Sequence, residues 1–124
     1  LVVLSACQSA LGKILDGDEV VGFPRAFMYA GTPLVVASLW NINDEAGFLL
    51  MCSFYRYLSY HYSYSESLRT AQLDIMKGKF KCLALPSNSQ DRAISFQHPY
   101  YWAPFVIYGY DRSLLDDRTQ DVRE

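Results

Sequence analysis

The stretch TPLVVASLW, Thr32 to Trp40, is the part of the sequence that most clearly predicts a fold. Its centre is an unbroken apolar run rich in β-branched residues. Such runs are typical of strands buried on both faces, as in a parallel sheet. The chain opens on a second run of the same kind, LVVL, Leu1 to Leu4. The two runs therefore predict two buried strands.

Helices are predicted between and after these strands. In the segment VVGFPRAFMYAG, Pro24 suits the first turn of a helix and Gly31 suits its C-terminal stop. A second helix begins at Asn43 or Asp44, either of which can cap it. Its predicted apolar face repeats at helical spacing and consists of Phe48, Met51, Cys52, Tyr55 and Leu58. A third helix follows the possible caps Ser63 and Ser65, ends at Gly78, and has Leu68, Ala71 and Ile75 in register.

The remainder of the chain is less regular. Residues Lys79 to Gln97 show no clear period and predict a long loop, and a third strand is predicted from Phe105 to Tyr108. From Asp111 onward the sequence is charged and lacks an apolar period. We therefore expect one domain over residues 1–110 and a charged tail or linker over residues 111–124.

The order of these elements predicts an α/β fold, because strands alternate with helices along the chain. Right-handed crossovers place the loops after Leu4 and Leu39 at the same edge of the sheet, where ligands and reactive groups usually lie. His98 precedes the third strand and is expected at the opposite edge. His61 is expected about 25 Å from the site edge, because the helix from Asp44 carries it away.

Composition excludes several classes of function. The 124-residue chain has a net charge of −2 and no basic stripe, so no nucleic-acid partner is expected. No apolar run approaches the length of about 18 residues that a membrane span needs. The cysteines Cys7, Cys52 and Cys82 are widely spaced, which argues against a disulfide framework and a structural metal. Reduced thiols favour an intracellular compartment. A core-like first residue without an initiator methionine predicts a fragment of a larger domain.

Cys7 is the candidate for chemistry because it follows a buried strand, which can hold a thiol rigidly beside a cleft. To act as a nucleophile it needs a nearby histidine or hydrogen-bond donors that favour the thiolate. A free cysteine more often only packs, so both interpretations stay open on the residues alone. The segment CQSALGK does not match a phosphate-binding loop, because Cys7 and Ile14 stand where Gly and Ser or Thr are required. Asp16, Asp18 and Glu19 are expected to form a solvated loop rather than a cation site.

Several segments of the chain resemble landmarks of one family, in the same order. The chain resembles CHAT domains, which are caspase-like domains of the separase and caspase superfamily, often found after tetratricopeptide repeats. The segments that carry the resemblance are LVVLSACQSALG, VVGFPRAFMYAGTPLVVASLWNINDEA, FYRYL, SESLRTAQL and HPYYWAPFVIYG. The resemblance implies a caspase-like three-layer sandwich with a mostly parallel sheet, of which this chain is the C-terminal part.

The resemblance also implies roles for particular residues. Cys7 would be the nucleophile of a cysteine–histidine dyad in a cysteine peptidase, with the histidine upstream of this chain. Neither His61 nor His98 matches that histidine, so the chain alone is expected to be inactive. Five residues are expected at the substrate: Gln8, Trp40, Asn41, Asn43 and Asp44. Asp44 as a helix cap is the stronger interpretation of that residue. Residues 42–45 read INDE, whereas many members of the family carry an additional acidic residue here. This difference weakens any inferred preference for a basic side chain in the substrate.

The implied partners are a protein or peptide substrate and tetratricopeptide repeats in the same parent chain. No cofactor, metal, nucleic acid or membrane is expected, and the expected location is the cytoplasm. The alternative is a non-catalytic CHAT scaffold or signalling module joined to such repeats. A nucleotide-binding doubly wound domain would need a glycine-rich first loop, which is not visible in this sequence.

Overall fold

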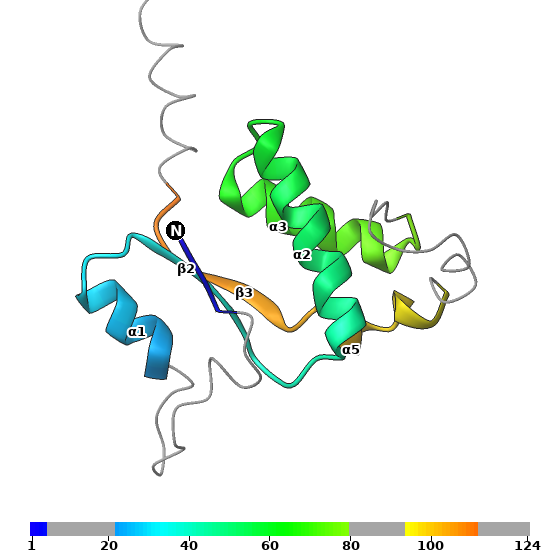
Figure 1. The fold of residues 1–124 in the computed structure, drawn as a ribbon, viewed down its shortest axis with the longest axis horizontal. Helices are drawn as coiled ribbons and strands as arrows, with labels where there is room; N and C mark the ends of the chain where they lie inside the picture. The colour runs from blue at the N-terminus through cyan, green and yellow to red at the C-terminus, as the bar shows by residue number, and fades with distance from the viewer. Residues whose placement is uncertain (5–21, 80–93, 112–124) are drawn as a thin grey trace, which may run out of the picture.

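The computed structural model describes residues 1–4, 22–79 and 94–111 (Figure 1). Three strands and several helices make up this part of the chain. In order they are β1 (Val2–Leu4), α1 (Gly22–Tyr29), β2 (Leu34–Ser38), α2 (Asp44–Ser59), α3 (Tyr64–Met76), the 3₁₀-helix η2 (Ile94–Gln97), α5 (Pro99–Trp102) and β3 (Phe105–Gly109). The predicted strands and the three long helices are therefore confirmed, with boundaries that differ by a few residues.

The described strands form one mixed sheet in the order β1-β2-β3. Strand β1 runs parallel to β2, with Leu4 opposite Ala37. Strand β3 runs antiparallel to β2, with Ser38 opposite Phe105. The expectation of a mostly parallel sheet is not met among these strands. An α/β arrangement of sheet and helices is present.

Strand β3 begins beside the edge of the sheet at which β2 ends. Strand β2 ends at its carboxyl edge, α2 leads the chain away from that edge, and α3 packs against α2 and brings the chain back (Figure 1). A strand that begins there must run opposite to β2. The expectation that His98 lies at the amino edge is therefore wrong, because the chain enters β3 beside the carboxyl end of β2.

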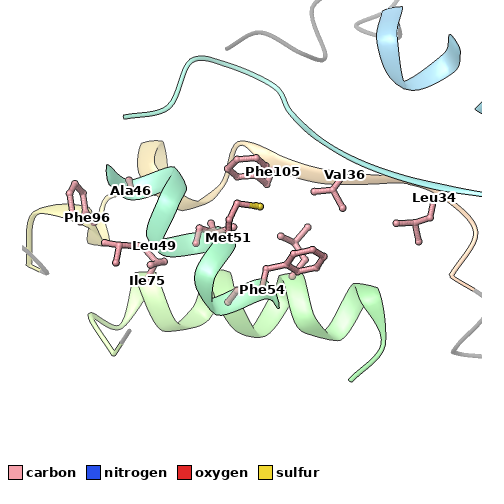
Figure 2. Close-up of a cluster of buried hydrophobic side chains, with 12 residues drawn as sticks. Leu34, Val36, Ala46, Leu49, Met51, Phe54, Ile75, Phe96 and Phe105 are labelled. Carbon is pink, nitrogen blue, oxygen red and sulfur yellow. The ribbon is translucent and has the colours of Figure 1, made fainter. Parts of the chain in front are cut away.

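The core lies where α2 and α3 pack on one face of the sheet (Figure 2). Leu34 and Val36 of β2 contribute from the sheet, and Phe105 contributes from the start of β3. The helices supply Leu49, Leu50, Met51 and Phe54 from α2 and Leu68, Ala71 and Ile75 from α3. The predicted register of α3 is thus confirmed. Helix α1 packs against β2 away from α2 and α3 (Figure 1).

The predicted apolar face of α2 is only partly correct. Phe48 and Tyr55 are 46% and 51% exposed, and Cys52 is half-buried. The buried face instead passes through Ala46, Leu49, Leu50, Met51, Ser53 and Phe54. Because α2 carries apolar residues nearly all round, the spacing alone could not fix which side faces the core.

Helix ends follow ordinary capping chemistry. Ser63, rather than Ser65, caps α3 and forms a capping box with Glu66. Gly31 and Gly78 follow α1 and α3 with φ of 94° and 64°, the left-handed conformation that glycine adopts at low cost. Within the predicted loop of Lys79 to Gln97, the described residues 94–97 form η2. Helix α5 was not predicted.

Asp111 is anchored to the start of α3. Its Oδ2 accepts hydrogen bonds from the Ser65 backbone N–H at 2.8 Å and from the Ser65 hydroxyl at 2.9 Å. Asp111 is only 8% exposed. A carboxylate at a helix N-terminus satisfies an orphan N–H and suits the helix dipole. Asp111, the first residue of the predicted tail, thus packs with the domain, whereas residues 112–124 lie outside the described residues.

Candidate functional site

The candidate site lies at the carboxyl edge of β1 and β2. Parallel pairing places Leu4, the last residue of β1, opposite Ala37, so both strands end at the same side of the sheet. Cys7 and Gln8 follow β1 in the sequence and lie outside the described residues. The described part of the site is therefore the loop from Leu39 to Asn43, which joins β2 to α2, together with α5.

Trp40 and Tyr100 form the centre of this described part. The Trp40 Nε1–H donates to the Tyr100 carbonyl at 3.0 Å, and the two rings stack with centroids 6.4 Å apart and planes at 27°. The Tyr100 hydroxyl donates in return to the Asn41 carbonyl at 2.7 Å. Tyr100 is 46% exposed, so it remains accessible to solvent.

Asn43 and Asp44 have different surroundings. The Asn43 Oδ1 accepts hydrogen bonds from Glu45 N at 3.0 Å and Ala46 N at 3.2 Å, and so caps α2. Asp44 is the first residue of the helix and is exposed. The cap is thus Asn43, not Asp44 as preferred from the sequence, and the Asp44 side chain stays accessible. Of the substrate residues expected at this loop, Asn43 is the one whose side-chain oxygen already has a structural role.

Helix α5 is held in place by contacts on both sides. His98 caps it, with Nδ1 accepting from the Tyr100 N–H at 3.2 Å, and Pro99 occupies the first turn. Gln72 of α3 donates through Nε2 to the carbonyls of Trp102 at 3.1 Å and Phe105 at 2.9 Å. In neutral His98 the proton therefore resides on Nε2, because Nδ1 is an acceptor. These contacts give His98 a structural role at the site edge.

Together, the two described segments at this edge carry acidic residues but no lysine or arginine. Asp44 and Glu45 are the charged residues of the segments Leu39 to Phe48 and Phe96 to Phe105, which contain no Lys or Arg. The described residues contain no group of three or more His, Cys, Asp or Glu side chains that could hold a metal ion. The described part of this edge thus combines two aromatic side chains with the exposed carboxylate of Asp44.

A comparison with protein families matches residues 1–110 to the model described as CHAT domain. The chain belongs to the CHAT family. A mouse protein named Tetratricopeptide repeat protein 28 is 32% identical over 114 residues, which is 92% of this chain and 4% of that protein. The human protein of the same name is 30% identical over 114 residues, with the same coverage of 92% and 4%. No solved structure matches this CHAT chain.

The CHAT chain thus spans a small part of the curated relatives, and those relatives carry tetratricopeptide repeats by name. This agrees with the expected association of the domain with such repeats. Among its described residues, no helix has the length and apolar character needed to cross a membrane.

Sequence reasoning missed the part that α5 and Tyr100 play at this edge of the CHAT domain. A signal was present in the residues HPYYW, because proline is favoured at the first position of a helix. The helix has only four residues, however, and no apolar period could reveal it. Its position depended on the direction of β3, which the sequence had suggested wrongly.

Proposed function

We propose that this CHAT chain is the C-terminal part of a caspase-like cysteine peptidase domain with a three-layer sandwich fold. The observation that carries the proposal is the family match over residues 1–110, which includes the segment with Cys7. The pairing of β1 with β2 supports it, because β1 ends at the same edge of the sheet as β2, which the Trp40 loop follows.

The proposed mechanism uses Cys7 as the nucleophile. A histidine supplied by the parent protein upstream of this chain takes the thiol proton. The resulting thiolate attacks the carbonyl carbon of a peptide bond, and backbone N–H groups stabilise the oxyanion. The same histidine then returns the proton to the leaving amine, and water hydrolyses the thioester to regenerate the thiol. The proposal includes no cofactor.

We assign substrate contacts to Gln8, Trp40, Asn41, Asn43 and Asp44. The exposure of Asn41 and Asp44 supports contact with a substrate. Asn43 would contribute through its side-chain N–H₂ group, because its oxygen caps α2. The substrate is a protein or peptide. The proposed location is the cytoplasm, which suits the expected reduced thiols.

The test is a peptidase assay of the intact parent protein with Cys7→Ala. We expect loss of cleavage without loss of folding, checked by circular dichroism and by thermal unfolding. Cys52→Ala is the matched control, because Cys52 is a half-buried thiol on α2. Cleavage that persists in Cys7→Ala would contradict the nucleophile assignment.

The second candidate function is a non-catalytic scaffold or signalling module joined to tetratricopeptide repeats. It is favoured by the names of the curated relatives, both of which are tetratricopeptide repeat proteins that this chain matches over 4% of their length. Inspection of the parent sequence upstream of Leu1 for a strand followed by His-Gly discriminates between the two. A parent without that histidine supports the scaffold.

A further inference from the structure

Tyr100 lies far from the β2–α2 loop in sequence and contacts it in three ways. Its carbonyl accepts from Trp40 Nε1, its hydroxyl donates to the Asn41 carbonyl, and its ring stacks on that of Trp40. Tyr100 thus accepts one hydrogen bond from the loop, from Trp40, and donates one to the loop, at Asn41. The polar side-chain groups of both aromatic residues, the Trp40 Nε1–H and the Tyr100 hydroxyl, are thus hydrogen-bonded, while Tyr100 remains 46% exposed.

The side of this contact formed by α5 is fixed by the rest of the domain. His98 caps the helix, and the Trp102 Nε1–H donates to the Gln97 carbonyl at 3.0 Å. Gln72 ties the end of α5 and the start of β3 to α3 through two hydrogen bonds. Tyr100 is therefore presented from a short helix that α3 and β3 hold in place.

The loop itself is fixed at its two ends. At its start the Leu39 N–H donates to the Pro104 carbonyl at 2.9 Å, and at its end Asn43 caps α2. Trp40 and Asn41 lie between these ends, outside any helix or strand. Their contacts with Tyr100 set the direction of the Trp40 ring and of the Asn41 backbone.

We propose that Tyr100 is a positioning residue that holds Trp40 and Asn41 in the conformation that binds substrate. This rests on the proposed function, which places those two residues at the substrate. Tyr100 acts through the loop and takes no part in bond cleavage. Its contribution is preorganisation: a loop held in its bound conformation loses less conformational entropy when the substrate binds.

The sharpest variant is Tyr100→Phe in the intact parent protein. It removes the hydroxyl bond to Asn41 and keeps both the ring and the backbone carbonyl that Trp40 uses. A neutral hydrogen bond changes an equilibrium by roughly fivefold. We expect amide hydrogen exchange in peptides covering residues 39–43 to rise by about fivefold, and KM for a cleaved peptide to rise similarly, with kcat within about twofold.

Tyr101→Phe is the matched control. Tyr101 is the next residue of α5, is half-buried, and packs its ring edge-on against Phe96 at 5.2 Å and Tyr100 at 5.3 Å, ring contacts that Tyr101→Phe keeps. Loss of its hydroxyl should leave both the exchange of residues 39–43 and KM unchanged. A general weakening of α5 would raise the exchange of residues 39–43 and KM in both variants, whereas a positioning role raises them in Tyr100→Phe alone.

The readouts separate this proposal from the proposed function. A parent without Cys7-dependent cleavage contradicts the peptidase assignment, yet the exchange measurement still tests Tyr100. Unchanged exchange at residues 39–43 in Tyr100→Phe overturns the positioning role. In a parent that cleaves through Cys7, an unchanged KM, or a loss confined to kcat, overturns it as well.

Discussion

Ser38 at the end of β2 pairs with Phe105 at the start of β3, so the residues before β3 lie at the carboxyl edge of the sheet. This antiparallel pair brings His98 and α5 to the candidate site, although they follow Trp40 by about 60 residues. The edge of the site is thus built from two segments, one after β2 and one before β3.

His98→Asn in the parent protein tests whether this histidine takes part in proton transfer. Asparagine is a good N-cap and can replace the Nδ1 acceptor that binds the Tyr100 N–H, but it has no imidazole. If the dyad histidine lies upstream as proposed, Cys7-dependent cleavage should stay within about twofold of the unmodified protein. A loss of 100-fold or more would make His98 the base.

Gly109 should tolerate no side chain. It has φ of 109°, and a Cβ there would lie 2.2 Å from the Pro33 carbonyl oxygen, which also accepts the Tyr110 N–H. Gly109→Ala is expected to lower the free energy of unfolding by well over 1 kcal/mol, since it combines a positive φ with a backbone clash.

Gly31→Ala is the matched control for this substitution. Gly31 also has a positive φ, of 94°, but a Cβ there meets nothing within 4 Å. Gly31→Ala should lower the free energy of unfolding by about 1 kcal/mol, because only the backbone strain contributes. Denaturant unfolding of both variants measures the difference, and equal costs would mean that β2 and β3 do not approach as closely as described.

Asp111 should stabilise the domain although it follows the last strand. Asp111→Ala removes both hydrogen bonds to Ser65 and is expected to cost about 1–2 kcal/mol of unfolding free energy, as for loss of a helix cap. Asp111→Asn keeps an acceptor oxygen and should cost less. Thermal unfolding checks the order, and no loss of stability in Asp111→Ala would argue that the domain ends before residue 111.

Some features were predictable because the chemistry is local. Leu1 to Leu4 is a continuous apolar run, as is the centre of Thr32 to Trp40, and the strands β1 and β2 form in these two stretches. Leu68, Ala71 and Ile75 sit on one side of a helix whose other residues are mostly polar, so the buried face of α3 followed from spacing. The sequence left Ser63 and Ser65 both open as caps, although Glu66, three residues after Ser63, is the local signal of the capping box that the structure contains.

Other features depended on contacts between distant residues. The direction of β3 depends on the edge at which the chain returns to the sheet and cannot be read from the apolar run at Phe105. The buried face of α2 was ambiguous because the large aromatic residues Phe48 and Tyr55 lie outside the face that buries Leu49 and Phe54. The contact of Tyr100 with Trp40 joins segments about 60 residues apart, and no local pattern encodes it. The predicted roles of Cys7 and Gln8 stay predictions, since both lie outside the described residues.

Tyr57 is expected to make stability depend on alkaline pH. Its hydroxyl donates to Asp74 Oδ2 at 2.6 Å, and this bond, with partial burial and the Asp74 charge, raises the pKa of Tyr57 above 10.0. Below pH 10 the tyrosine is protonated in both folded and unfolded chains, so the stabilisation is fully present. Above it the unfolded chain loses its proton first, and the stabilisation is lost as the pH rises through the folded-state pKa.

Tyr57→Phe should therefore lower the free energy of unfolding by about 1–2 kcal/mol at neutral pH and make its decline above pH 10 shallower. In this variant Asp74 should keep its ion pair with Arg56, which is 3.4 Å long, so its carboxylate still has a charged partner. Tyr55→Phe is the control, because Tyr55 lies 51% exposed on the same helix. Urea unfolding across neutral and alkaline pH compares the three proteins. Equal alkaline slopes in Tyr57→Phe and Tyr55→Phe would show that the bond to Asp74 does not link tyrosine ionisation to folding.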